Sequence, residues 1–81
     1  MARSYPAAYP RAAREARLGG TAIVRVLVSE TGRPLRLEAL RGPRPLTEAA
    51  IASIRRWTFE PARKNGHAVE AWTVIEVPFQ P

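Results

Sequence analysis

The stretch TAIVRVLVSETGRPLRLEAL, from Thr21 to Leu40, decides the fold because it predicts two strands joined by a tight turn. In Thr21–Glu30 apolar residues occupy both sides of the alternation, which is typical of a strand in the middle of a sheet. Gly32 can adopt the positive φ that a chain reversal needs. Leu35–Leu40 alternates as a strand with one buried face, which includes Leu35. We therefore expect a β-hairpin at the centre of the fold.

Two helical segments flank this hairpin. Pro10–Leu18 has Pro at a favourable first helical position and Gly19-Gly20 as its stop, which predicts a short helix. Thr47 is a good N-cap for a second helix over Glu48–Trp57. Its apolar residues form one stripe along the helix, and this stripe needs a sheet to cover. The residues of the stripe are Ala50, Ile51, Ile54 and Trp57, and we expect Trp57 to pack under the sheet.

The last strand is predicted over Ala68–Phe79 by its strict alternation. Pro78 has no N–H to donate, so this strand belongs at an edge of the sheet. The face expected to be buried comprises Val69, Ala71, Thr73, Ile75, Val77 and Phe79, and the other face comprises Glu70, Trp72, Val74 and Glu76.

The order helix, strand, strand, helix, strand predicts an α+β fold. We expect a three-stranded antiparallel sheet in the order 2-1-3, with two helices packed on one face. A single domain over residues 9–81 would follow a flexible lead at 1–8. In this arrangement the last strand leaves one long edge of the sheet unpaired.

The residues that most catalytic sites use are scarce in this chain. It has no Cys and no Asp, and its one His, His67, lies in a turn-like stretch with no obvious partner. A thiol nucleophile, a Ser-His-Asp triad and a metal cluster therefore all lack parts. Glu70 and Glu76 lie about 20 Å apart along one strand, too far for a catalytic pair of carboxylates. We predict no enzyme activity, no catalytic residue, no metal and no cofactor.

The net charge of +6 arises entirely in residues 1–44, which carry nine Arg against three Glu. Such a balance permits an acidic partner, whether a nucleic acid, an anionic envelope surface or an acidic peptide. The Arg residues are scattered singly with few aromatics among them, which favours a solvated basic face over a nucleic-acid site. No apolar run approaches the roughly 20 residues of a membrane span, so we expect no membrane insertion by this segment.

Most of the chain carries a recognisable order of features. YPRAAREARLGGTAIVRVLVSETGRPLRLEAL, followed by LTEAAIASIRRWTFEPARKNGHAVEAWTVIEVPF, resembles the C-terminal domain of the TonB family, the periplasmic energy transducers of Gram-negative bacteria. The resemblance covers Tyr9 to Phe79. The features that carry it are Tyr9-Pro10, Gly20, Gly32, Ala50, Arg56-Trp57, Phe59, Pro61-Ala62 and Gly66.

The resemblance implies a partner and a way of binding it. TonB-like domains bind the TonB box, a short segment of outer-membrane transporters, as an added strand beside the final strand. It also implies a position for Tyr9-Pro10 near the bound segment. The partner-binding residues expected on this basis are Tyr9, Pro10, Val69, Glu70, Ala71, Trp72, Thr73, Val74, Ile75, Glu76 and Val77.

The resemblance further implies coupling to ExbB- and ExbD-like proteins through an N-terminal anchor that these residues do not include. The expected location is the periplasm, with a tether to the inner membrane, and the expected role is uptake of nutrients such as siderophores. A homodimer through the same exposed edge is a further expectation. The alternatives are a standalone periplasmic adaptor, which would bind another envelope partner or the cell wall, and a basic nucleic-acid-binding module.

Overall fold

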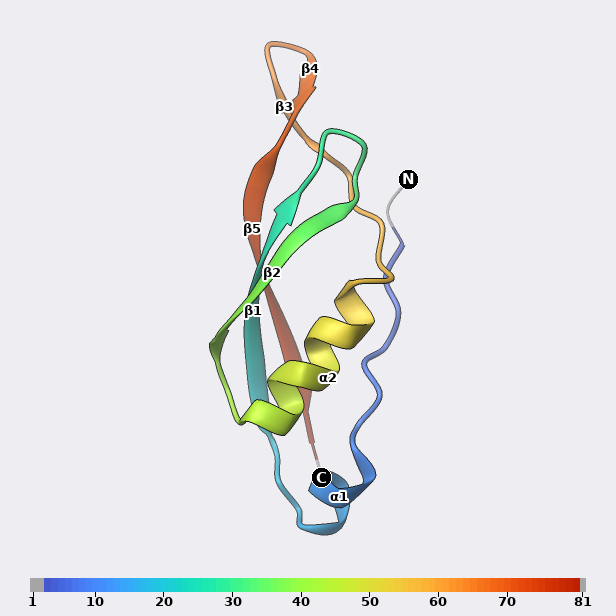
Figure 1. Cartoon of the computed structure of the whole chain (residues 1–81), viewed down its shortest axis with the longest axis vertical. Coiled ribbons are helices and arrows are strands. Elements are labelled where there is room, and N and C mark those ends of the chain that lie inside the picture. The colour runs from blue at the N-terminus through green and yellow to red at the C-terminus, as the bar shows by residue number, and fades with distance from the viewer. Residues whose placement is uncertain (1–2, 81) are drawn as a thin grey trace.

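The central hairpin forms as predicted. A computed structural model describes residues 3–80, in an elongated molecule with principal extents of 48 × 21 × 16 Å (Figure 1). Strand β1 (Gly20–Val28) pairs antiparallel with β2 (Pro34–Arg41) on one side and with β5 (Ala71–Phe79) on the other. The sheet order β2-β1-β5 confirms the predicted 2-1-3 order, with the two helices packed on one face.

The core lies between β1 and helix α2 (Arg44–Ile54). Every second residue of β1 is buried: Ala22, Val24, Val26 and Val28. The helix contributes Leu46, Ala50 and Ile54 to the same cluster, while Ala13 and Phe79 close it at one end. Because β1 is the central strand, its other row is half-buried as well, and this explains why apolar residues occupy both sides of its alternation.

Helix α2 begins four residues earlier and ends three residues earlier than the sequence suggested. Its N-cap is Pro43 rather than Thr47, and Pro45 lies in its first turn, where a missing N–H costs nothing. The Thr47 hydroxyl is buried inside the helix and donates to the Arg44 carbonyl at 3.0 Å. Trp57 lies beyond the helix end but still packs against the core, as predicted.

Helix α1 (Arg11–Glu15) is shorter than the predicted Pro10–Leu18. Pro10 is its N-cap rather than its first helical residue. Arg17 has φ 56°, so the chain leaves the helical conformation two residues before Gly19. The Leu18 N–H closes this end by donating to the Ala13 carbonyl at 2.8 Å.

Strand β2 contains two bulges that the sequence pattern does not reveal. The register with β1 shifts between Leu27 and Val28 and again between Ile23 and Val24, which leaves Leu35 and Leu40 without direct partners. Both side chains are about half exposed, at 51% and 53%. The expectation of a buried Leu35 is therefore wrong, because a bulge shifts the alternation of side chains by one residue.

The predicted last strand is divided in two. Strands β3 (Ala62–Lys64) and β4 (His67–Val69) form a separate hairpin that projects beyond the β1–β2 turn (Figure 1). Its turn residues Asn65 and Gly66 have φ 51° and 81°, values that suit a two-residue hairpin turn. Val69 belongs to β4 and Glu70 to no strand, so their expected places in the last strand are wrong, and β5 begins at Ala71.

Within residues 3–80, neither helix is long and apolar enough to cross a membrane.

Candidate partner-binding edge

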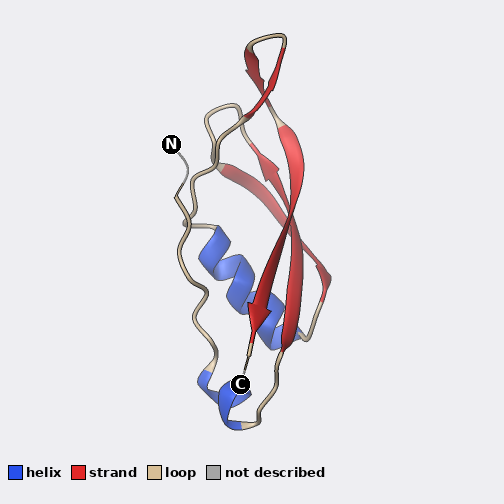
Figure 2. Ribbon diagram, turned by 180° about the vertical axis from the view of Figure 1, so that it is seen from behind, coloured by secondary structure: helices blue, strands red, loops and turns tan. Residues whose placement is uncertain are grey.

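Strand β5 offers an open edge. All nine of its residues pair with β1 in one unbroken register, from Val28 opposite Ala71 to Gly20 opposite Phe79. On its other side no strand pairs with it among residues 3–80 (Figure 2). In a strand paired on one side, the N–H and C=O groups of every second residue point away from the partner. Strand β5 therefore presents a regular row of backbone donors and acceptors.

The opposite edge of the sheet is less suited to pairing. Strand β2 carries both bulges, begins with Pro34 and bears the charged side chains of Arg36, Glu38 and Arg41. Bulges, proline and charge are the features that protect natural edge strands from adding another strand. Strand β5 has no register shift, and its proline, Pro78, lies next to its last residue. The two edges therefore differ, and β5 is the accessible one.

The side chains of β5 divide between two faces, as the alternation predicted. Ala71, Thr73, Ile75 and Val77 are half-buried on the helix side, and Phe79 is fully buried there. Trp72 and Val74 are 42% and 57% exposed on the outer face, beside Glu76.

Trp72 is held in place from the neighbouring strands. The Arg25 guanidinium lies 4.4 Å from the centroid of its ring, a cation–π contact. Arg25 also donates two hydrogen bonds to one Glu38 carboxylate oxygen, at 2.7 and 3.0 Å. The three side chains thus form a row from β2 across β1 to β5, and one flank of the indole is already covered.

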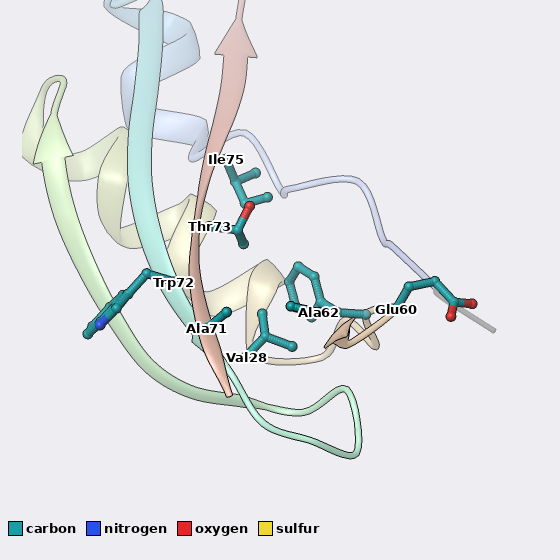
Figure 3. Close-up of a pocket in the computed structure, with 8 residues that line it drawn as sticks. Val28, Glu60, Ala62, Ala71, Trp72, Thr73 and Ile75 are labelled. Carbon is teal, nitrogen blue, oxygen red and sulfur yellow. The ribbon is translucent and has the colours of Figure 1, made fainter. Parts of the chain in front are cut away.

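A trough runs along the helix side of β5. One hollow of about 290 Å³ is lined by Val28, Phe59, Glu60, Ala62, Ala71, Trp72, Thr73 and Ile75 (Figure 3). A second hollow of about 250 Å³ is lined by Arg3, Ser4, Trp57, Thr58, Phe59 and Ile75. Phe59 and Ile75 line both hollows, so the two adjoin each other, and we call them together the inner trough.

The N-terminal segment, residues 3–9, contributes Arg3 and Ser4 to the lining of the second hollow. Arg3 and Thr58 exchange two backbone hydrogen bonds of 2.9 and 2.8 Å. The Tyr5 carbonyl accepts from the Ser53 hydroxyl at 2.7 Å and from the Trp57 indole N–H at 3.0 Å. Residues 3–8 were expected to form a flexible lead, and residues 1 and 2 of that lead lie outside the described part.

Tyr9 and Pro10 lie at the end of the sheet rather than along the edge. The Tyr9 ring packs edge-on against Phe79 at 5.4 Å, and its hydroxyl donates to the Leu18 carbonyl. Pro10 caps α1. The structure therefore brings Tyr9 next to the last residue of β5 and gives Pro10 a structural position.

Sequence reasoning missed several residues of this site. Phe59, Ala62, Arg3 and Ser4 line the inner trough, yet none was a candidate. The Asn65-Gly66 pair was a signal for the β3–β4 hairpin that was not used. No local pattern pointed to the trough, because its walls come from three separate parts of the chain.

Candidate metal ligands are not clustered in the described part of the chain. Residues 3–80 contain no group of three or more His, Asp or Glu placed to hold a metal ion. His67 is exposed in β4, opposite Lys64 in the hairpin. The arrangement of β5 and the trough is suited to holding an extended chain.

A small α+β domain with one regular, unpaired sheet edge has the architecture of domains that can accept an added strand. Within this class, the chain belongs to the TonB family, because the family model for the Gram-negative bacterial TonB protein C-terminal region matches residues 5–81. This confirms the resemblance seen in the sequence. The family is periplasmic in Gram-negative bacteria.

Two similar proteins support this assignment. Protein tonB2 of Pseudomonas aeruginosa is 30% identical over 74 residues, which are 89% of this chain and 27% of that protein. The chain thus spans about a quarter of the length of this relative. The solution NMR structure of the Pseudomonas aeruginosa TonB C-terminal domain matches 98% of this chain and 82% of its own, with a TM-score of 0.80. At 23% identity, this second match shows the shared fold alone.

Proposed function

We propose that this domain binds the TonB box of outer-membrane transporters by adding it as a strand to the edge of β5. In this proposal the domain does not catalyse a reaction and is the gripping end of an energy transducer for active uptake of nutrients such as siderophores. The observation that carries the proposal is the unpaired, bulge-free edge of nine residues beside an apolar trough.

The physical basis is β-augmentation. Each backbone hydrogen bond between β5 and the added segment contributes a net of about 0.5–1.5 kcal/mol and depends little on sequence. A pull along the strand direction loads several such bonds at once. Side chains next to the edge, such as Trp72, Thr73 and Ile75, would then supply selectivity. Val69 and Glu70 immediately precede β5 in the sequence and would meet one end of the bound segment.

The remaining partners belong to the whole protein. We propose that further parts of the native protein tether this domain to the inner membrane and contact ExbB- and ExbD-like proteins. Homodimers would compete with the TonB box, because a second copy pairing at β5 would use the same backbone groups.

The test is an NMR titration of the isotope-labelled domain with TonB-box peptides from candidate transporters. We expect chemical-shift changes and slower amide exchange along β5, and neither change with a scrambled peptide. The amides of β2 serve as the internal control, since that edge is bulged and charged. Equal responses at β2 and β5, or silence at both, would contradict strand addition.

Salt dependence separates this function from the alternatives. A peptide held by backbone hydrogen bonds should change its Kd by less than about threefold between 50 and 200 mM salt, whereas nucleic-acid binding weakens by orders of magnitude. If the Arg-rich residues 1–44 respond to any polyanion while β5 is silent, the domain is a basic nucleic-acid module. If β5 responds equally to unrelated strand-forming peptides, a standalone adaptor is the better description.

A further inference from the structure

The inner trough lies where alternate side chains of an added strand would project. Its lining includes Ala71, Thr73 and Ile75, which are the helix-side row of β5 itself. Neighbouring strands in a sheet direct paired side chains to the same face. Any residue of the added strand that stands opposite this row therefore points into the trough.

The two hollows lie beside successive parts of β5, since Ala71, Thr73 and Ile75 line the first and Ile75 lines the second. Residues i and i+2 of a strand point to the same face and are about 6.6 Å apart. The hollows adjoin each other at Phe59 and Ile75, so successive inward side chains would enter one hollow each. The residue between them would point to the outer face.

The two faces at this edge offer different surroundings. On the trough side, the small side chains of Ala62 and Ala71 line a hollow of about 290 Å³, to which Phe59 also contributes (Figure 3). On the outer face, Arg25 already covers part of Trp72, and Val74 is open to solvent. A bound side chain thus meets an apolar cavity of limited volume on one face only.

We infer that Phe59 and Ala62, which lie outside β5, determine the specificity of the edge by selecting large apolar side chains at alternate, inward positions of the bound strand. This inference rests on the proposed strand addition. Outward positions of the same strand tolerate polar and charged side chains. Phe59 supplies the apolar floor, and the small volume of Ala62 keeps the first hollow open.

The experiment fills the first hollow from the protein side. Ala62→Leu adds bulk at an exposed residue of β3 that lines the hollow. Ala68→Leu is the matched control: it adds the same atoms to the same hairpin on the opposite face, because Ala62 pairs with Val69 while Ala68 pairs with Arg63. Amide spectra of both variants verify the fold before any binding measurement.

Each protein is titrated with a TonB-box peptide and with a set of variants in which one position at a time is changed to Ala. We expect Ala62→Leu to weaken binding of the parent peptide about tenfold, which is the scale of losing one buried apolar side chain. The loss of affinity caused by Ala62→Leu should fall below about twofold for the peptide variant that already has Ala at the position facing the first hollow. The Ala68→Leu variant should bind every peptide as the original domain does.

The outcomes separate the inference from the proposed function. If the β5 amides respond to the peptides but Ala62→Leu has no effect, or weakens all peptides equally, the trough does not select side chains while strand addition stands. The same conclusion follows if Ala substitutions at outward positions of the peptide remove the effect of Ala62→Leu just as Ala substitutions at inward positions do. If the β5 amides never respond, strand addition itself fails.

Discussion

At Gly32 the backbone of another segment lies where a β-carbon would be. A Cβ added there would lie 2.1 Å from the Phe59 carbonyl oxygen, and the residue has φ +82°. The Phe59 N–H also donates to the Gly32 carbonyl at 2.8 Å, so the β1–β2 turn and the segment after α2 are held together at this point. One glycine thus serves both the hairpin turn and the position of the trough floor.

Gly32→Ala should lower the free energy of unfolding by about 3 kcal/mol or more, since it combines positive-φ strain with a backbone clash. Gly66→Ala is the matched control, because Gly66 has nearly the same φ, +81°, and no atom within 4 Å of an added Cβ. Gly66→Ala should lower the free energy of unfolding by only about 1 kcal/mol. Urea unfolding of both variants measures the difference, and equal losses would contradict the role given to the clash.

Ser53 is one of two polar side chains, with Thr47, that helix α2 buries. Its hydroxyl donates to the Tyr5 carbonyl, which ties the N-terminal segment to α2. Ser53→Ala should destabilise the domain by about 1 kcal/mol and speed amide exchange in residues 3–8. Ala52→Ser, at the exposed neighbouring position, should change stability by less than about 0.5 kcal/mol. Unchanged exchange in residues 3–8 would show that this hydrogen bond does not hold the segment.

At the scale of elements, the bulges of β2 decide which leucines contribute to the core. Leu37 packs against the core from between the two bulges, while Leu35 and Leu40 are more exposed. Leu37→Ala should cost about 2 kcal/mol, whereas Leu35→Ala and Leu40→Ala should each cost less than about 1 kcal/mol. Chemical denaturation checks this order. A cost for Leu35→Ala as large as that for Leu37→Ala would contradict the observed register.

The elements also show how far sequence reasoning reaches. Alternation located β1 and β5 and separated their two faces, because every second residue is buried in β1 and is less exposed than its neighbours in β5. The start of α2 was misplaced because Thr47 looks like an N-cap, while the structure uses Pro43 and buries Thr47. The alternation also runs through Glu70 without a break, so it could not show where β4 ends and β5 begins.

At the scale of the whole molecule, stability depends on a small core. Fully buried Val26 lies in the central strand, whereas Val74 is 57% exposed in β5. Val26→Ala should cost about 2 kcal/mol and lower Tm by roughly 10 °C, because a domain of this size loses about 4–8 °C per kcal/mol. Val74→Ala should lower Tm by only a few degrees. Thermal unfolding followed by circular dichroism distinguishes the two, and similar shifts would contradict the assignment of faces.

The sequence by itself determined the α+β class, the strand order, the edge position of the last strand and the family. The first three follow from the period of apolar residues and from single residues such as Pro78, all of which act locally, whereas the family follows from the ordered features that the sequence shares with it. Only the tertiary structure decided the bulges of β2, the docking of residues 3–9 and the inner trough. Each of these depends on contacts between distant segments, such as Gly32 with Phe59 or Tyr5 with Ser53, and local periodicity carries no information about which distant segments meet.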